Sequence, residues 1–183
     1  RKPTGENVGH GMPLSDSFKN EELGLQWAHL KSRNPKESFQ SGSGQLCFQA
    51  AGMDVGDAPI LFVQPTNHAY KAQVEIEISE SSSAGLILFS NPVIATGGVI
   101  KKGQLEMYVR GNTQRKVDWK EDRAFFKVVN DHHDISVFYS KDGHEWDRFD
   151  FGVQFDGERN VRIGLFAAGE GMVFFRDFRY QGI

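Results

Sequence analysis

The segment Glu75-Ile76-Glu77-Ile78-Ser79-Glu80 has the acidic spacing best suited to catalysis in this sequence of 183 residues. Carboxylates two residues apart project from one face of a β-strand, and a bulge can bring a third carboxylate onto that face. Hydrolysis of a glycosidic bond with retention of configuration uses two carboxyl groups about 5–5.5 Å apart, one as nucleophile and one as acid/base. Glu75 would then be the nucleophile and Glu80 the acid/base.

The same segment also fits a purely structural strand. From Lys71 to Ile78, polar and apolar residues alternate strictly, which is typical of a strand with one wet face and one buried face. The pattern resembles the Glu-x-Asp-x-x-Glu strand of retaining glucanases. However, Glu77 stands where that family has Asp, and the expected aromatic neighbours are absent. We therefore expect no catalytic residues in this chain, and a glucanase-like hydrolase that uses Glu75 and Glu80 remains an alternative.

Two other groups of reactive side chains favour structural roles. His132 and His133 stand between Asp131 and Asp134, but adjacent strand residues point to opposite faces, so the two imidazoles would not converge on a metal. We expect a polar hairpin tip there. The single Cys47 excludes an internal disulfide, and its place between Leu46 and Phe48 predicts a side chain on a strand and not a nucleophile.

The elements that must position these side chains are short strands. Leu105, Met107 and Val109 alternate with polar residues, as do Val161, Ile163 and Leu165, and 84–89 is apolar almost throughout. Asp142-Gly143 predicts a tight reversal before a second run that contains Trp146. One helical turn fits Phe18 to Leu25. The sequence predicts an all-β fold, with two antiparallel sheets packed as a β-sandwich of the jelly-roll kind.

Composition and charge set the limits on size and partners. The net charge is −3, from 21 basic and 24 acidic residues, and no basic block is long enough to bind nucleic acid. No apolar run is long enough to span a membrane. Residues 1–13 contain almost no apolar side chain, so we expect a linker or extended arm there and one β-sandwich domain over 14–183.

Seven short patterns occur along the chain in an order that resembles the C-terminal β-sandwich of glycoside hydrolase family 43, the β-xylosidases and α-L-arabinofuranosidases. They are Asp16-Ser17-Phe18, Leu23-Gly24-Leu25-Gln26-Trp27, Gly44-Gln45-Leu46, Leu61-Phe62-Val63-Gln64-Pro65-Thr66, Ala84-Gly85-Leu86, Tyr139-Ser140 with Asp142-Gly143 and Trp146, and Phe175 with Phe178 and Tyr180. The resemblance covers roughly residues 14–183.

The resemblance implies a concanavalin A-like sandwich that acts as a non-catalytic accessory domain. It also implies an upstream five-bladed propeller in the same polypeptide that hydrolyses xylan- or arabinan-type polysaccharide, and a secreted or periplasmic location. In some relatives an aromatic loop before the strand matched by 161–166 enters the propeller's active site. Here that place holds Gly157 and Glu158, with Phe151 and Phe155 as the nearest aromatics. A free-standing carbohydrate-binding module is a further alternative.

Two binding sites are expected on this sandwich. The candidate platforms for stacking xylo- or arabino-oligosaccharides are Trp119 and Tyr108. Trp119 has charged neighbours, and Tyr108 alternates away from the apolar face of its strand. Sandwiches of this type often join their first and last strands through a hard cation, so Asp16 and Asp177 are candidate ligands for a structural calcium ion. No cofactor is required, and Trp27 and Trp146 are expected to be packed.

Overall fold

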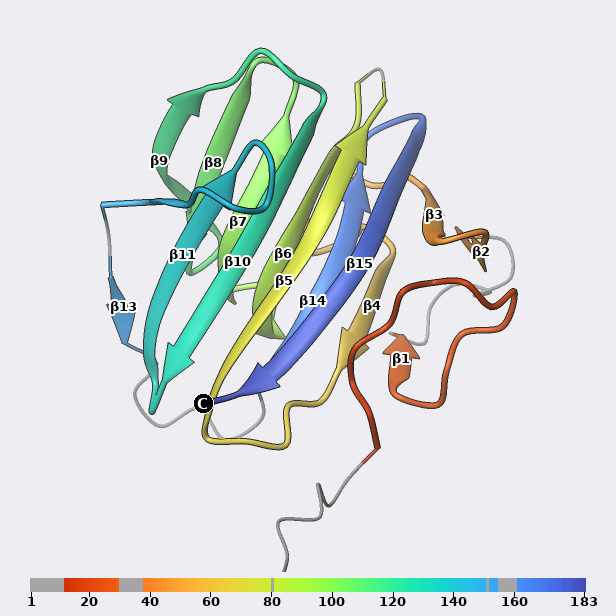
Figure 1. The fold of residues 1–183 in the computed structure, drawn as a ribbon. Coiled ribbons are helices and arrows are strands. Elements are labelled where there is room, and N and C mark those ends of the chain that lie inside the picture. Colours follow the sequence, from red (N-terminus) through yellow and green to blue (C-terminus); the bar gives the residue numbers. More distant parts are fainter. Residues whose placement is uncertain (1–11, 30–37, 80, 151, 155–160) are drawn as a thin grey trace, which may run out of the picture.

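Strands dominate the computed structural model, which describes residues 12–29, 38–79, 81–150, 152–154 and 161–183 (Figure 1). The strands are β1 (Trp27–His29), β2 (Phe39–Gly42), β3 (Gln45–Gln49), β4 (Ile60–Val63), β5 (Ala69–Ile78), β6 (Ser83–Asn91), β7 (Ile94–Lys101), β8 (Gln104–Val109), β9 (Asn112–Asp118), β10 (Arg123–Asp131), β11 (Asp134–Ser140), β12 (Asp147–Arg148), β13 (Val153–Gln154), β14 (Arg162–Ala168) and β15 (Met172–Gly182).

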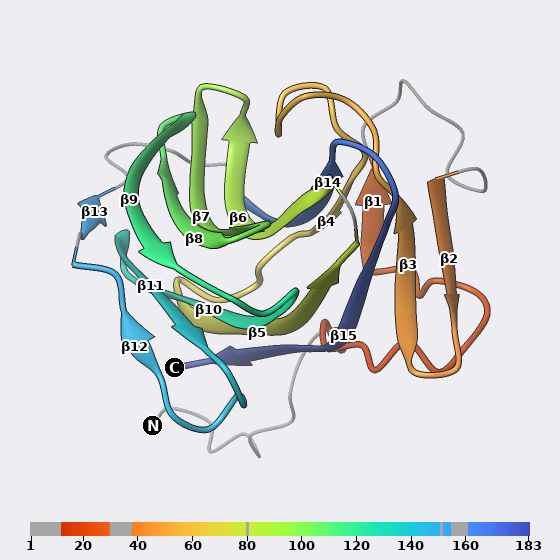
Figure 2. The same ribbon diagram turned by 90° about the horizontal axis from the view of Figure 1, so that it is seen from above.

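The strands form two antiparallel sheets that pack face to face. The seven-stranded sheet has the order β1-β4-β14-β6-β7-β8-β9, and the eight-stranded sheet has the order β12-β11-β10-β5-β15-β3-β2, with β13 paired to β11. The seven-stranded sheet curves into a trough whose open side faces away from the other sheet (Figure 2). The predicted all-β sandwich is confirmed.

Strict alternation places β5 at the centre of the eight-stranded sheet. Its apolar side chains, including Val74 and Ile76, are buried against the other sheet, whereas Glu75 and Glu77 lie on the outer face. β5 pairs with β10 on one side and β15 on the other. The main core between the sheets also contains Leu105 and Met107, as their spacing predicts.

The trough of the seven-stranded sheet holds a second apolar cluster. Ile87 and Phe89 of β6 point into it, and the segment 51–59 covers them with the buried side chains of Val55 and Ala58. Both ends of this covering segment are tied to β14, because Ala51 N donates to Ala167 O and Pro59 O accepts from Ala167 N. This explains why β6 is apolar on both faces.

Two predicted reversals differ in outcome. His132 and His133 both have positive φ, 49° and 81°, and form the two-residue turn between β10 and β11, so the predicted hairpin tip is confirmed. The reversal at Asp142-Gly143 is not tight. Tyr139 pairs with Asp147, so the loop is longer, and Asp142 Oδ1 organises it by accepting from His144 N and Glu145 N. These backbone donors hold the pKa of Asp142 below its ordinary value.

The helical turn expected near the start of the sandwich is not present at residues 18–25. Bends and a turn, not the expected helical turn, occupy 18–25, and Phe18 is fully buried with φ of 52°. Packing begins at Leu14, which belongs to the main core. The expected linker over 1–13 lies almost entirely outside the described residues and stays a prediction.

Candidate functional site

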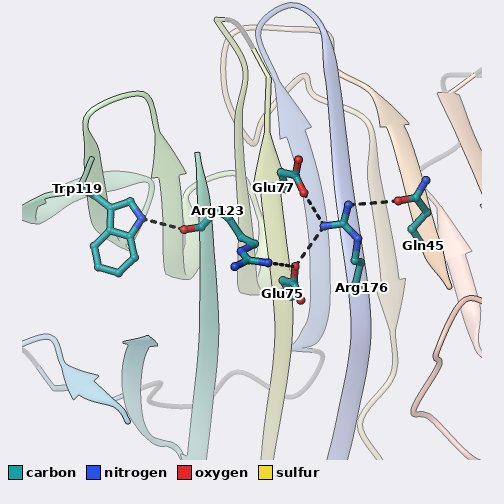
Figure 3. Close-up of polar contacts among 6 residues, drawn as sticks. All are labelled: Gln45, Glu75, Glu77, Trp119, Arg123 and Arg176. Carbon is teal, nitrogen blue, oxygen red and sulfur yellow. Dashed lines mark hydrogen bonds and ion pairs between the residues drawn. The ribbon is translucent and has the colours of Figure 1, made fainter. Parts of the chain in front are cut away.

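The acidic residues of β5 form an ion-pair network on the outer face of the eight-stranded sheet (Figure 3). Arg176 Nη1, from β15, lies 3.2 Å from Glu75 Oε1 and 2.7 Å from Glu77 Oε2. Arg123 Nη1, from β10, lies 3.6 Å from the same Glu75 oxygen, and Arg176 Nη2 donates to Gln45 Oε1 at 3.3 Å. The network therefore crosses four neighbouring strands.

This arrangement accounts for the two glutamates structurally. The side chain of Glu75 is only 15% exposed, and one of its oxygens is shared by two guanidinium groups. Arginine forks neutralise carboxylates in this way and fix side chains across a sheet. A nucleophile needs an open approach to the reacting carbon instead. Glu80, the partner in the glucanase hypothesis, lies outside the described residues.

A second carboxylate, Glu106 of β8, was not expected to be buried. It lies in the trough at 1% exposure, and its oxygens contact Lys101 Nζ at 2.9 Å and Lys116 Nζ at 3.7 Å. Gln104 Nε2 and Thr113 Oγ1 also donate to it, at 2.6 and 2.8 Å. This buried charge is held by two lysines and two hydrogen-bond donors, and it cross-links β7, β8 and β9.

Asp16 and the C-terminal strand do meet, as the calcium hypothesis requires. Asp16 N donates to Phe178 O at 2.8 Å, which joins the start of the sandwich to β15. The Asp16 carboxylate accepts from three N–H donors among the described residues: Phe18 N at 2.8 Å, Gln26 Nε2 at 3.2 Å and Trp27 Nε1 at 2.9 Å. These donors take most of the roughly four lone-pair positions that a carboxylate offers.

Asp177 pairs with a neighbouring arginine. Its side chain is 51% exposed and pairs with Arg179. The Asp177 carboxylate raises the pKa of the Arg179 guanidinium through this hydrogen bond and its charge. Across the described part of the chain, no cluster of three or more His, Cys, Asp or Glu side chains could hold a metal ion. Calcium prefers six to eight oxygen ligands, backbone carbonyls included, and a calcium ion at Asp16 and Asp177 stays a prediction.

Replacement of Asp16 by Asn should destabilise the domain whether or not calcium is present. An amide offers one acceptor oxygen where the carboxylate offers two, so we expect a loss of about 1–3 kcal/mol in the free energy of unfolding. Asp177→Asn is the matched control, because an exposed ion pair contributes only about 0–1 kcal/mol. Urea unfolding in calcium and in EDTA measures both. A calcium-dependent stabilisation of the wild type that Asp16→Asn abolishes would instead establish a calcium site at Asp16.

Trp119 does not form an exposed platform. It is 6% exposed, its Nε1 donates to Arg123 O at 2.9 Å, and its ring meets the edge of Tyr139 with centroids 6.0 Å apart. The expectation of an exposed indole is wrong. The chain crosses from one sheet to the other between β9 and β10, and the indole closes the core at that crossing, although its sequence neighbours are charged.

Tyr108 lies in the trough, half-buried against the second apolar cluster. Burial raises the pKa of its hydroxyl, with smaller contributions from Asp54 and Glu106. Concave faces are where ligands usually bind, but here the segment 51–59 already packs on the neighbouring strands. The structure thus does not bring Trp119 and Tyr108 together in one exposed site.

An aromatic and cationic cluster that the sequence did not predict lies on the outer face of the eight-stranded sheet. Lys127 Nζ lies 3.9 Å from the ring centroid of Trp146 and 4.9 Å from that of Phe138. Burial, and then the charge of Lys71, lowers the pKa of Lys127. Trp146 is half-buried, as its expected packing implies, and the ammonium group occupies one face of its indole.

A comparison with known families decides what kind of domain this is. The sequence profile of the family described as "Beta xylosidase C-terminal Concanavalin A-like domain", of glycoside hydrolase family 43 (GH43), matches residues 15–181. The chain belongs to this family. The match covers nearly the whole sequence, and it agrees with the seven patterns between Asp16 and Tyr180.

Solved structures show the fold of the GH43 C-terminal domain in larger chains. The GH43 BlXynB protein from Bacillus licheniformis is 19% identical with a TM-score of 0.79, and the similarity covers 100% of this chain and 42% of that one. A xylan β-1,4-xylosidase from Bacillus halodurans is 14% identical with a TM-score of 0.77, covering 98% and 41%. This chain therefore spans about two fifths of the length of these relatives.

The same fold also occurs as nearly a whole chain. A GH131 β-glucanase catalytic domain from Podospora anserina has a TM-score of 0.61 at 10% identity, and the similarity covers 94% of this chain and 97% of that one. No curated protein matches the sequence. Among the described residues, no helix is long and apolar enough to cross a membrane.

Proposed function

We propose that this GH43 C-terminal domain is the non-catalytic accessory domain of a larger enzyme that hydrolyses xylan- or arabinan-type polysaccharide. The family match over residues 15–181 carries the proposal. The coverage of 42% of the Bacillus licheniformis protein supports it, because more than half of that chain is additional sequence. The catalytic residues would belong to an upstream five-bladed propeller in the same polypeptide.

The role that we assign to the domain is to dock on the propeller and stabilise it. Interfaces between domains of one chain typically bury about 600–1,500 Å², and a partner held at the rim of an active site fixes the loops there. The rigid elements needed for such a role are present, since two sheets enclose one continuous core and both ends of the domain meet at Asp16 and Phe178.

The charged groups on β5 support a structural role for this chain itself. Glu75 and Glu77 are neutralised by Arg176, and Arg123 approaches Glu75 as well. An enzyme built on Glu75 would have to break these ion pairs before an approaching sugar could be attacked. The GH131 likeness shows that the fold can carry a catalytic site, but at 10% identity it shows the fold alone.

We expect the 183-residue chain to hydrolyse neither aryl-xylosides, aryl-arabinosides nor β-glucans. Release of the aryl group or of reducing sugar measures this directly. Glu75→Gln should leave the background unchanged, while lowering stability slightly because Arg176 loses one of its two carboxylate partners. Turnover that is present in the wild type and abolished in Glu75→Gln would establish the glucanase-like alternative in place of the accessory role.

A further inference from the structure

Two lysines lie side by side on the outer face of the eight-stranded sheet. Lys71 of β5 and Lys127 of β10 are diagonal neighbours, because Lys71 pairs with Val129 and Lys127 with Gln73. Diagonal neighbours on antiparallel strands are about 7–8 Å apart. Both lysines are half-buried, and neither side chain makes an ion pair or a hydrogen bond to a described residue. The strands around them, β15, β5, β10, β11 and β12, lie wholly within the described residues.

The acidic side chains at the neighbouring positions already have nitrogen partners of their own. These pairs are Glu75 and Glu77 with Arg176, Asp177 with Arg179, and Asp131 with His132. Burial lowers the pKa of Lys127, and the charge of Lys71 lowers it further. Like charges on adjacent strands are destabilising. An anion placed between the two ammonium groups would therefore relieve a repulsion that the free domain contains.

Aromatic rings hold one of these cations in place. The Lys127 ammonium lies 3.9 Å from the ring centroid of Trp146 and 4.9 Å from that of Phe138. Contacts of this kind attract a cation without neutralising its charge. Because the ammonium is positioned before a ligand arrives, binding costs less side-chain entropy than it would at a freely moving lysine.

Two glutamine amides flank the lysines and narrow the kind of anion that fits. Gln73 pairs with Lys127, and Gln181 of β15 pairs with Lys71. Neither amide has a hydrogen-bond partner among the described residues. An amide both donates and accepts, as a sugar hydroxyl does, whereas an ammonium only donates and matches a carboxylate. A uronic acid carries both kinds of group on one ring.

We propose that this outer face binds a uronate unit of an acidic polysaccharide, with Lys71 and Lys127 on its carboxylate and the two glutamine amides on its hydroxyls. The choice of a polysaccharide over an acidic protein rests on the proposed function, since the parent enzyme would act on such a polymer. Half-exposed charges attract an anion only modestly, so we expect a dissociation constant on the order of 1 mM. The site is separate from Trp119 and Tyr108.

The test is an NMR titration of the 183-residue chain with two xylo-oligosaccharides of equal length, one of which carries a glucuronate branch. Signals of Lys71, Gln73, Lys127 and Gln181 should shift in a saturable way with the acidic sugar. The neutral sugar should bind about fivefold more weakly or worse, the size expected when one charge pair is lost. Salt at about 1 M shortens the Debye length to roughly 3 Å and should remove most of this preference.

Lys71→Gln and Lys127→Gln each remove one charge, and each should weaken binding of the acidic sugar about fivefold. Lys102→Gln is the matched control, because it removes the same charge from an exposed turn between β7 and β8 in the other sheet. It should bind like the wild type, and circular dichroism checks that all three variants fold.

The proposal is overturned if the two sugars bind equally, or if Lys102→Gln weakens binding as much as Lys127→Gln does. It is also overturned if Lys71→Gln and Lys127→Gln leave sugar binding unchanged but abolish binding of the separate chain to the truncated parent enzyme. The face would then bind an acidic surface of the catalytic part. Truncation of the parent enzyme tests the accessory role without any uronate, so a domain that docks but binds no uronate loses only this site.

Discussion

Gly97→Ala is expected to destabilise the domain by more than the roughly 1–3 kcal/mol typical of an overpacked core. A Cβ atom at Gly97 would lie 2.1 Å from Leu86 O and 2.7 Å from Ile87 Cα. Both are backbone atoms of the paired strand β6, so no side-chain rotation can relieve the contact. Total stabilities of about 5–15 kcal/mol make such a loss large, and the trough should open or the domain should unfold.

Chemical unfolding monitored by circular dichroism gives the size of this effect. Gly152→Ala is the matched control, since the nearest atom to its added Cβ is Arg148 Nη2 at 3.8 Å, an ordinary contact. We expect the control to unfold within about 0.5 kcal/mol of the wild type. If Gly97→Ala unfolds at the same denaturant concentration as Gly152→Ala, the close packing of β6 on β7 is not what shapes the trough.

Most of the fold could be predicted from the sequence because strands repeat every two residues. The alternation in 71–78 defined both faces of β5, and the turn at His132 and His133 followed from polar residues between two apolar runs. The covering segment 51–59 could not be predicted in this way. Its glycines and aspartates indicate a loop, and its packing on β6 depends on contacts between distant parts of the chain.

The candidate site was predicted less well, for a related reason. Trp119 stands among charged residues, which indicated an exposed loop, but a crossover between sheets buries one residue and exposes its neighbours. Asp16 was placed correctly beside β15, yet its role depends on the donors Gln26 and Trp27, which lie ten and eleven residues along the chain. Sequence order does not show which donors reach a carboxylate.

Removal of residues 14–183 from the whole enzyme should lower both the melting temperature and the turnover of the remaining catalytic part. Docking would bury surface on both domains, and the truncated enzyme would expose it. If docking contributes about 2 kcal/mol, the melting temperature should fall by roughly 4–8 °C, given about 2–4 °C per kcal/mol for a domain of this size. Adding the separate 183-residue chain should restore part of the loss, which distinguishes docking from misfolding of the truncated enzyme.

The most direct test of the accessory role is therefore calorimetry of the whole and the truncated enzyme, combined with kinetics on short and polymeric substrates. The docked arrangement predicts a lower melting temperature and a lower turnover number on both kinds of substrate after truncation. An unchanged melting temperature together with unchanged kinetics on both substrates would contradict docking and would leave a loosely tethered binding module as the better description of this domain.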